Sequence, residues 1–193
     1  MRRVFFSFYH EGDKKRIGVV RNHGMCKPGI EAAGYIDAAE WEELKKQGDD
    51  AIEKWIDEQL KGTSITAVLI GEHTAERRWV NEEIFKSYEK GNALIGIYIH
   101  NIKGLDEKTT PKGPNPFDNF EFLKSGDSLA SIVKTYDWKD DDGYNNFRHW
   151  IETAIASWKK PNDDLKKKKP PKPPVPGPVT PPRPPRRREV GSR

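Results

Sequence analysis

Residues 65–99 read ITAVLIGEHTAERRWVNEEIFKSYEKGNALIGIYI, and this stretch decides the fold. Its two ends, residues 65–70 and 93–99, are short apolar runs of the kind found in strands buried on both faces. Between them, residues 78–90 repeat apolar side chains at helical spacing, at Val80, Ile84 and Tyr88. Gly91 follows where a helix needs a C-terminal cap. This order predicts two parallel strands joined by a helical crossover.

Strands and helices also alternate outward from this unit. Residues 4–8 form another apolar run with aromatic side chains, and residues 132–138 form a weaker one, so both are predicted to be strands. Residues 49–60 and 145–158 repeat their apolar positions at helical spacing. The pattern predicts an α/β fold of three layers, with a mostly parallel central sheet flanked by helices.

The segment between the first strand and residue 49 gives a weaker signal. Apolar residues around Ile17 are compatible with a short helix, and residues 23–34 hold three glycines and a proline, which predicts a loop. Tyr35 and Ile36 are interpreted as a weak second strand that ends at Asp37. Ligands of open parallel sheets bind beyond the carboxyl ends of the strands, which makes Asp37 a candidate contact.

Charge and proline are unevenly distributed along the chain. Residues 159–193 hold 11 of the 15 prolines, with 12 Lys or Arg and 3 Asp or Glu, so this part carries a formal charge of +9. Residues 1–158 carry −5, and the net charge of +4 describes neither part. Proline density and like charges favour an extended chain. We therefore predict a domain over residues 1–158 and a disordered tail over residues 159–193.

The sequence indicates a cytoplasmic protein of no common cofactor-binding class. Its single cysteine, Cys26, permits no disulfide within the chain, and no stretch resembles a signal peptide or a membrane span. Glycine-rich phosphate loops, a zinc-binding arrangement of His and Cys, and the Gly-x-Ser-x-Gly elbow are all missing from the sequence. The basic charge lies in the tail, so nucleic-acid binding by the domain is not indicated.

Two adjacent carboxylates, Glu82 and Glu83, lie on the predicted helix of residues 78–90. Glu82 has Lys86 at i+4, which makes a favourable solvent-facing pair. Glu83 has Trp79 at i−4 on its own face, and an aromatic neighbour can shield a carboxylate and alter its ionisation. On spacing alone, a solvated helix glutamate is the commoner case, so a structural and a catalytic interpretation of Glu83 both stay open.

Several strings resemble a known family. Residues 77–84, RRWVNEEI, look like the TIR signature, in which Trp, a small residue and two variable residues precede Glu, and residues 3–8 look like the first TIR strand. The chain as a whole resembles the ThsB family, the TIR-like components of Thoeris antiphage systems. The remaining shared strings are VRNH 20–23, AAG 32–34, WE 41–42, VLIG 68–71, EKGN 89–92, KGPNPFD 112–118, YDW 136–138 and DDGYN 141–145.

The resemblance implies a flavodoxin-like TIR fold and an NAD+ glycohydrolase or ADP-ribosyl cyclase. In such a domain Glu83 would be the catalytic carboxylate, which stabilises positive charge on the ribose, and Trp79 would wall the nicotinamide pocket. Ser7, Phe8 and Tyr9 would contact the nucleotide after the first strand, and Asp37 is a further substrate-binding candidate. NAD+ would be the substrate, and no separate cofactor or metal is expected.

The resemblance also implies partners. The product would be a cyclic ADP-ribose isomer or a related ADP-ribose conjugate that activates a ThsA-type effector. A phage-derived trigger would start an enzyme that is dormant at rest, and a homo-oligomer is compatible with this class. The resemblance leaves the product isomer, the trigger and the basal activity open.

Two other functions remain open at this point. A TIR-like adaptor would assemble through its sheet edges and helices without turnover, and it would not need Glu83 beside Trp79. The tail, with basic runs at residues 166–169 and 186–188, is compatible with a solubilising extension, an SH3-like ligand, an anionic-membrane tether or a nucleic-acid contact. The first of these is the simplest interpretation of the tail.

Overall fold

A parallel sheet of five strands forms the centre of the computed structural model, which describes residues 2–25, 30–34, 36 and 38–168. The strand order is β2-β1-β3-β4-β6, and every neighbouring pair is parallel. This is the flavodoxin-like order of a doubly wound fold, in which ligands bind where the chain changes direction beside β1 and β3. The strands are β1 Arg2–Ser7, β2 Ile30–Ala33, β3 Ile65–Ile70, β4 Ala93–Tyr98 and β6 Thr135–Asp137.

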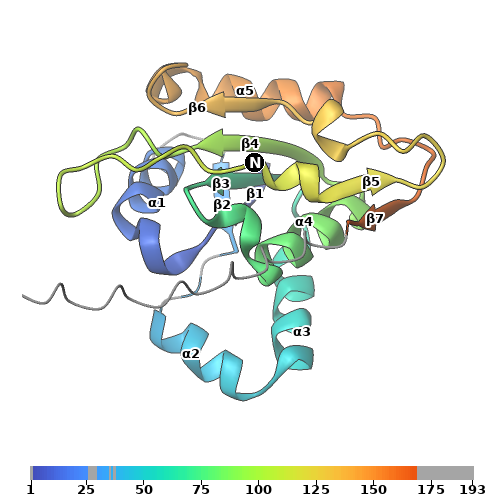
Figure 1. Cartoon of the computed structure of the whole chain (residues 1–193), viewed down its shortest axis with the longest axis horizontal. Coiled ribbons are helices and arrows are strands. Elements are labelled where there is room, and N and C mark those ends of the chain that lie inside the picture. Colours follow the sequence, from blue (N-terminus) through green and yellow to red (C-terminus); the bar gives the residue numbers. More distant parts are fainter. Residues whose placement is uncertain (1, 26–29, 35, 37, 169–193) are drawn as a thin grey trace, which may run out of the picture.

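Helices cover both faces of this sheet, so the predicted three-layer α/β fold is confirmed. Figure 1 shows α5 above the sheet and α3 and α4 below it, with α1 beside the carboxyl ends of the strands. A small antiparallel sheet of β5 (Phe120–Phe122) and β7 (Leu165–Lys167) lies at one end of the domain, on the right in Figure 1. The helices are α1 His10–Met25, α2 Ala38–Lys46, α3 Asp49–Leu60, α4 Arg78–Lys90, α5 Gly143–Ser157, and the 3-10 helices η1 Thr74–Glu76, η2 Pro116–Asn119 and η3 Leu129–Ser131.

Successive apolar side chains of β1 pack on opposite faces of the sheet, so the strand contributes to two separate parts of the core. Val4 and Phe6 pack into a cluster that includes residues of α1 and α5, whereas Phe5 packs against Ile52 and Ile56 of α3. Successive side chains of a strand point to opposite faces, so an apolar run covered by helices on both sides has no exposed position. All six residues of β3 and all six of β4 are buried for the same reason.

The predicted second strand is wrong. Residues 30–33, which fall inside the predicted loop of residues 23–34, form β2 and pair with β1 from Arg2↔Ile30 to Phe5↔Ala33. A four-residue edge strand with Glu31 exposed carries too little apolar signal to be recognised. Ile36 is not in a strand, and Tyr35 lies outside the described residues.

Gly34 explains why β2 ends where it does. Its φ of +80° lies in the left-handed region, and an added Cβ would come within 2.7 Å of the Phe6 carbonyl oxygen. Only glycine accepts that conformation and that close approach together. The helix α1 is longer than expected and contains a non-helical residue, Asp13, at φ −122°.

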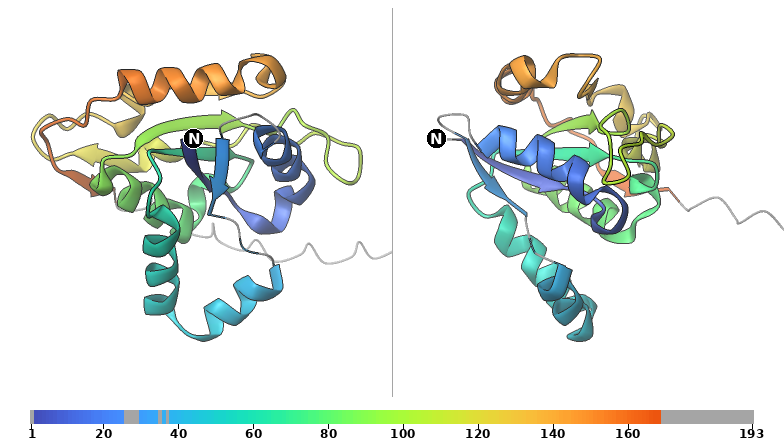
Figure 2. Two further views of the ribbon diagram at one scale, coloured as in Figure 1. Left: turned by 180° about the vertical axis from the view of Figure 1, so that it is seen from behind. Right: turned by 90° about the vertical axis from the view of Figure 1, so that its left-hand side faces the viewer.

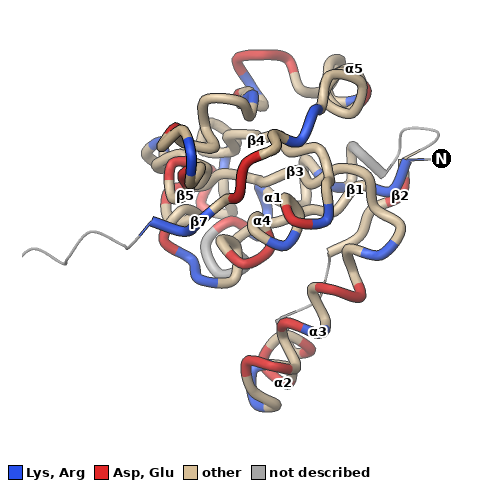
Figure 3. The backbone as a smooth tube through the Cα atoms, turned by 90° about the vertical axis from the view of Figure 1, so that its right-hand side faces the viewer, with Lys and Arg blue, Asp and Glu red and all other residues tan. Residues whose placement is uncertain are grey.

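The helices α2 and α3 form an arm that projects from the body of the domain, as Figure 2 shows. The sequence did not indicate α2, because it offers few apolar residues. Its inner side is held to α3 by Trp41, whose ring meets that of Trp55 edge-on at a centroid distance of 6.3 Å. Figure 3 shows acidic and basic residues interspersed along both helices, and pairs such as Lys46–Glu43 are exposed. Exposed pairs of this kind add little stability, so aromatic packing holds the arm.

Ordered structure continues beyond the predicted end of the domain at Trp158. Residues 159–168, here called the C-terminal strap, contain β7, which pairs antiparallel with β5. Leu165 is 6% exposed and packs in one cluster with Phe120, Phe122 and Tyr88. One apolar residue in a basic, proline-containing segment gave no sequence signal for this strand. Residues 169–193, the rest of the predicted tail, lie outside the described residues.

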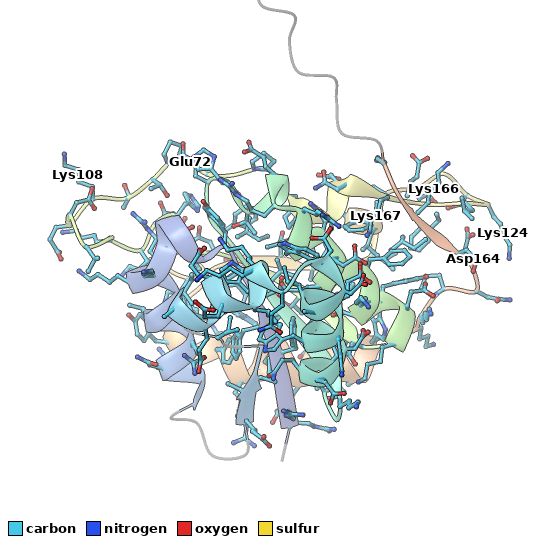
Figure 4. The ribbon with its side chains drawn as sticks, turned by 90° about the horizontal axis from the view of Figure 1, so that it is seen from below. Glu72, Lys108, Lys124, Asp164, Lys166 and Lys167 are labelled. Atoms are coloured by element: carbon cyan, nitrogen blue, oxygen red, sulfur yellow. The ribbon has the colours of Figure 1, made fainter. Side chains whose placement is uncertain are left out.

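Polar contacts fix the strap to the domain. The Tyr88 hydroxyl donates to the Asp163 carbonyl at 3.0 Å, and the Lys168 amide donates to the Asn119 carbonyl at 2.7 Å. Lys166 pairs with Glu121 at 2.8 Å, and Lys167 pairs with Glu82 of α4. Figure 4 shows Lys166 and Lys167 along β7, with Lys124 and Asp164 near its beginning.

The contacts of the strap indicate where the chain can be shortened without loss of stability. A chain ending at Lys168 should unfold at nearly the wild-type temperature, and a chain ending at Trp158 should lose about 2–3 kcal/mol because it exposes the apolar surface under Leu165. For a chain of this size that loss lowers the melting temperature by roughly 4–12 °C in thermal unfolding followed by circular dichroism. Leu165→Ala should reproduce most of the loss and Lys166→Ala little of it. Equal melting temperatures for the two shortened chains would contradict this role of the strap.

Gly113 lies buried where the loop after β4 meets the turn after β3. An added Cβ would come within 2.1 Å of the Gly71 carbonyl oxygen and 2.7 Å of the Glu72 carbonyl oxygen. Both obstacles are backbone atoms, which cannot rotate away as a side chain does. The Gly-Pro-Asn-Pro-Phe-Asp string therefore begins with a glycine for a steric reason.

Gly113→Ala should destabilise the protein by about 3 kcal/mol, because overpacking against backbone forces the loop to move. Gly18→Ala is the matched control. Gly18 lies inside α1 with nothing within 4 Å of an added Cβ, so alanine should be neutral there or stabilising by about 0.5–1 kcal/mol. Urea unfolding of both variants measures the difference. A Gly113→Ala protein as stable as Gly18→Ala would refute the steric argument.

Candidate active site

A cavity of about 200 Å³ opens where β1 ends and α4 begins. Phe8 and Tyr9 come from the segment after β1, Trp79 and Glu83 from α4, and Trp55 from α3. The cavity therefore lies at the carboxyl edge of the sheet, beside the two strands where this strand order places ligands.

Glu83 is a buried carboxylate at this cavity. It is 7% exposed and shares the inner side of α4 with Val80, Ile84 and Ser87, because these positions repeat at the spacing of one face of a helix. The Ser7 hydroxyl, at the end of β1, donates a hydrogen bond of 2.6 Å to Glu83 Oε2. Ser7 is fully buried, so this bond fixes the carboxyl group from the side of the sheet.

Burial raises the pKa of Glu83 to about 8, because removal from water disfavours the charged form. The hydrogen bond from Ser7 acts in the opposite direction and lowers the pKa by less than burial raises it. The neutral acid therefore predominates at neutral pH. A cationic ligand in the cavity would favour the carboxylate again.

Five of the eleven residues that line the cavity are aromatic. Trp79 is half-buried one helical turn before Glu83, and Tyr9 follows the end of β1. Trp41 of α2 and Trp55 of α3 close the outer side. Rings of this kind stack against planar heterocycles, which suits a base or a nicotinamide ring.

Three cations also line the cavity. The Arg77 guanidinium carbon lies 3.7 Å from the ring centroid of Tyr9, and that of Arg78 lies 4.5 Å from Trp79. Lys45 of α2 is the third. A cavity with one buried acid, aromatic walls and basic residues can hold an anionic ligand that carries an aromatic ring.

The structure brings together four of the residues predicted from sequence: Glu83, Trp79, Phe8 and Tyr9 all line the cavity. Ser7 is not a cavity-lining residue. Its hydroxyl instead donates a hydrogen bond to the Glu83 carboxyl group. Asp37, the remaining candidate, lies outside the described residues.

Sequence reasoning missed several cavity residues. Trp55 lies in the predicted helix of residues 49–60 and packs against the core, but it also lines the cavity. Arg77 and Arg78 were not among the residues predicted to form the site. Their position directly before Trp79 was an available signal, since residues just ahead of a helix at the carboxyl edge face the ligand side. Lys45 had no such signal, because α2 was not predicted.

Other polar clusters in the described residues have structural explanations. Arg16 pairs with Asp13 at 3.1 Å and donates to the carbonyls of Ile102 and Lys108, which ties the loop after β4 to α1. No group of three or more His, Cys, Asp or Glu side chains within the described ranges could hold a metal ion. The helices of that same part of the chain are all too short or too polar to cross a bilayer.

The parallel sheet of this strand order, with a buried glutamate four residues after tryptophan on the helix that follows β3, defines a TIR-like domain. Comparison with known families agrees. The family model described as "Thoeris protein ThsB, TIR-like domain" matches residues 5–104, which is more than half of the chain. The chain belongs to this ThsB TIR-like family, as its sequence motifs predicted.

A curated relative extends the similarity over most of the chain. The alignment with the "Putative cyclic ADP-D-ribose synthase ThsB1" of Bacillus cereus (strain MSX-D12) is 39% identical over 189 residues. It covers 78% of this chain and 98% of the relative.

Proposed function

We propose that this protein is an antiphage-defence enzyme that cleaves NAD+ to nicotinamide and converts the remainder into a cyclic ADP-ribose isomer or a related ADP-ribose conjugate. Family membership and the name of the Bacillus cereus relative support the reaction class. The observation that carries the proposal is the Glu83 carboxyl group, which is buried and fixed by Ser7 at an aromatic cavity.

In the proposed reaction the bond between the ribose C1 and the nicotinamide nitrogen breaks. Its electron pair stays with the nitrogen, which becomes neutral, and the ribose carbon takes on oxocarbenium character. A carboxylate fixed nearby stabilises the positive charge as it moves onto the sugar. An adenine nitrogen that attacks the ribose carbon closes a cyclic product, and a water that attacks it and loses a proton gives ADP-ribose.

The raised pKa of Glu83 is compatible with this role because the substrate is itself a cation at the nicotinamide ring. Its arrival beside the carboxyl group would favour loss of the proton, so the charged form would appear when substrate is bound. Trp79 would stack on the nicotinamide ring, and Phe8 and Tyr9 would contact the rest of the nucleotide. NAD+ is the substrate in this proposal, and the chain needs no further cofactor.

The wider setting is part of the same proposal. The product would diffuse to a ThsA-type effector, a phage-derived trigger would release the enzyme from a dormant state, and assembly into a homo-oligomer would accompany activation. The protein would act in the cytoplasm, where NAD+ is available.

The test is product analysis with the full chain. Purified protein is incubated with NAD+, alone and with lysate of phage-infected cells, and nicotinamide and ADP-ribose products are separated by chromatography and identified by mass spectrometry. Nicotinamide release with a cyclic or conjugated ADP-ribose supports the enzyme. The second candidate is a TIR-like adaptor, and the exposed charged arm of α2 and α3 is the feature that favours it. No turnover under either condition would favour the adaptor.

A further inference from the structure

Arg77 occupies a defined place between the helix that carries Glu83 and the segment after β1. It is the N-terminal cap residue of α4, and its backbone carbonyl accepts hydrogen bonds from the amide and the side chain of Asn81. Asn119 donates in turn to the Asn81 side chain at 2.9 Å. The backbone of Arg77 is therefore held by a network independent of its guanidinium group.

The guanidinium group itself packs against an aromatic ring and has no ion-pair partner among the described residues. The guanidinium carbon lies 3.7 Å from the centroid of the Tyr9 ring, so a cation–π contact restricts the position of the group. Among the described residues, no hydrogen-bond partner lies within reach of its buried Nε atom. A buried donor without a partner costs free energy, which a ligand that accepts its hydrogen bond would recover.

The other two cavity cations differ from Arg77 in this respect. Arg78 pairs with Asp49 at 2.6 Å, and Lys45 pairs with Glu42 at 2.5 Å. Among the described residues no carboxylate lies within ion-pair distance of Arg77, and Glu83 accepts its hydrogen bond from Ser7 instead. In this part of the chain, Arg77 is therefore the cavity cation whose charge is not compensated.

We propose, building on the function proposed above, that Arg77 binds the diphosphate of the dinucleotide substrate. A planar guanidinium group offers donors in a fork that matches two phosphate oxygens, and Arg77 lines the cavity and is partly exposed. The first turn of α4 carries no acidic residue and no side-chain cap, so the helix adds positive potential at the same place. Glu83 acts on the ribose and Arg77 on the diphosphate, so the two fix the substrate at separate points.

This division makes Arg77 a determinant of substrate class. A ligand with the diphosphate, such as NAD+ or ADP-ribose, should need Arg77, and one without it, such as nicotinamide riboside, should not. The loss of one charge-assisted interaction typically corresponds to about a 10- to 100-fold change in affinity.

The experiment compares wild type with Arg77→Gln, which keeps a planar polar group but removes the charge, and Arg77→Lys, which keeps the charge without the fork. The control is Arg148→Gln, an exposed arginine of α5 in the other helical layer. Dissociation constants for ADP-ribose and nicotinamide riboside are measured by isothermal titration calorimetry, and nicotinamide release from NAD+ is measured in parallel.

Arg77→Gln should weaken ADP-ribose binding by about 10- to 100-fold and change nicotinamide riboside binding less than about threefold. The ADP-ribose affinity of Arg77→Lys should lie between those of wild type and Arg77→Gln, and Arg148→Gln should bind both ligands as wild type does. Equal losses for both ligands, or no difference between Arg77→Gln and wild type, would overturn the diphosphate site. Because binding does not depend on turnover, Arg77-dependent ADP-ribose binding without nicotinamide release in the presence of lysate from phage-infected cells would retain the site and reject the proposed enzyme.

Discussion

Replacing Glu83 by glutamine should lower nicotinamide release from NAD+ by about a thousandfold, because glutamine keeps the size of the side chain but cannot supply negative charge. Glutamine can still accept the hydrogen bond from Ser7, so the side chain should keep its place. The measurement is initial rate against NAD+ concentration, with the activating lysate present. The loss should fall on kcat, since charge develops only as the bond breaks.

Glu82→Gln is the matched control, since it makes the same chemical change one position earlier on α4. Glu82 is half-buried, pairs with Lys167 of the strap and is not among the residues that line the cavity. Its replacement should change the rate less than about threefold. A Glu83→Gln enzyme as active as Glu82→Gln would remove Glu83 from the mechanism, and equal large losses in both would point to damage to α4.

The stability of the protein should depend on pH through the same residue. The folded pKa of Glu83, about 8, lies above its ordinary value of 4.5, so the folded state holds a proton that the unfolded state releases. The stability that this bound proton contributes to the folded state is fully present below the ordinary pKa and is lost as pH rises through the folded pKa. Between about pH 5 and pH 9 the wild type should lose on the order of 3–5 kcal/mol relative to Glu83→Gln, which cannot ionise.

The measurement is the free energy of unfolding in urea for both proteins across that pH range. Burial also raises the pKa of Asp13, against the opposing effect of Arg16, but that contribution is common to both proteins and cancels in their difference. Glu82→Gln should track the wild type. A constant difference between wild type and Glu83→Gln over the range would show that Glu83 ionises in the folded protein as it does in water.

The strands and helices that could be predicted are those whose burial follows from their own sequence. β3 and α4 have the predicted boundaries, because a fully buried strand and a helix with one apolar face leave a periodic signal. β2 and β7 could not be predicted, since each is a short edge strand stabilised by a partner far away in the chain. The second strand was consequently misplaced, and the strap was assigned to the tail.

The candidate site divides in the same way. Spacing placed Trp79 and Glu83 on one face of a helix, and the resemblance to the ThsB family supplied a role that spacing left open. Ser7 was named as a substrate contact, whereas the structure places its hydroxyl on Glu83. The approach of Arg77 to Tyr9 had no sequence signal, because the two residues come from different elements.

The sequence by itself determined the α/β class, the parallel arrangement of the strands and the family, because these follow from local periodicity and from strings of adjacent residues. Only the tertiary structure decided that Glu83 is buried with a raised pKa, that Ser7 fixes it, and that the aromatic rings of α2 and α3 close the cavity. The physical reason is that desolvation and hydrogen bonding depend on which distant segments meet. In this chain Ser7 and Glu83 are 76 positions apart, and only the pairing of β1 with β3 brings them together.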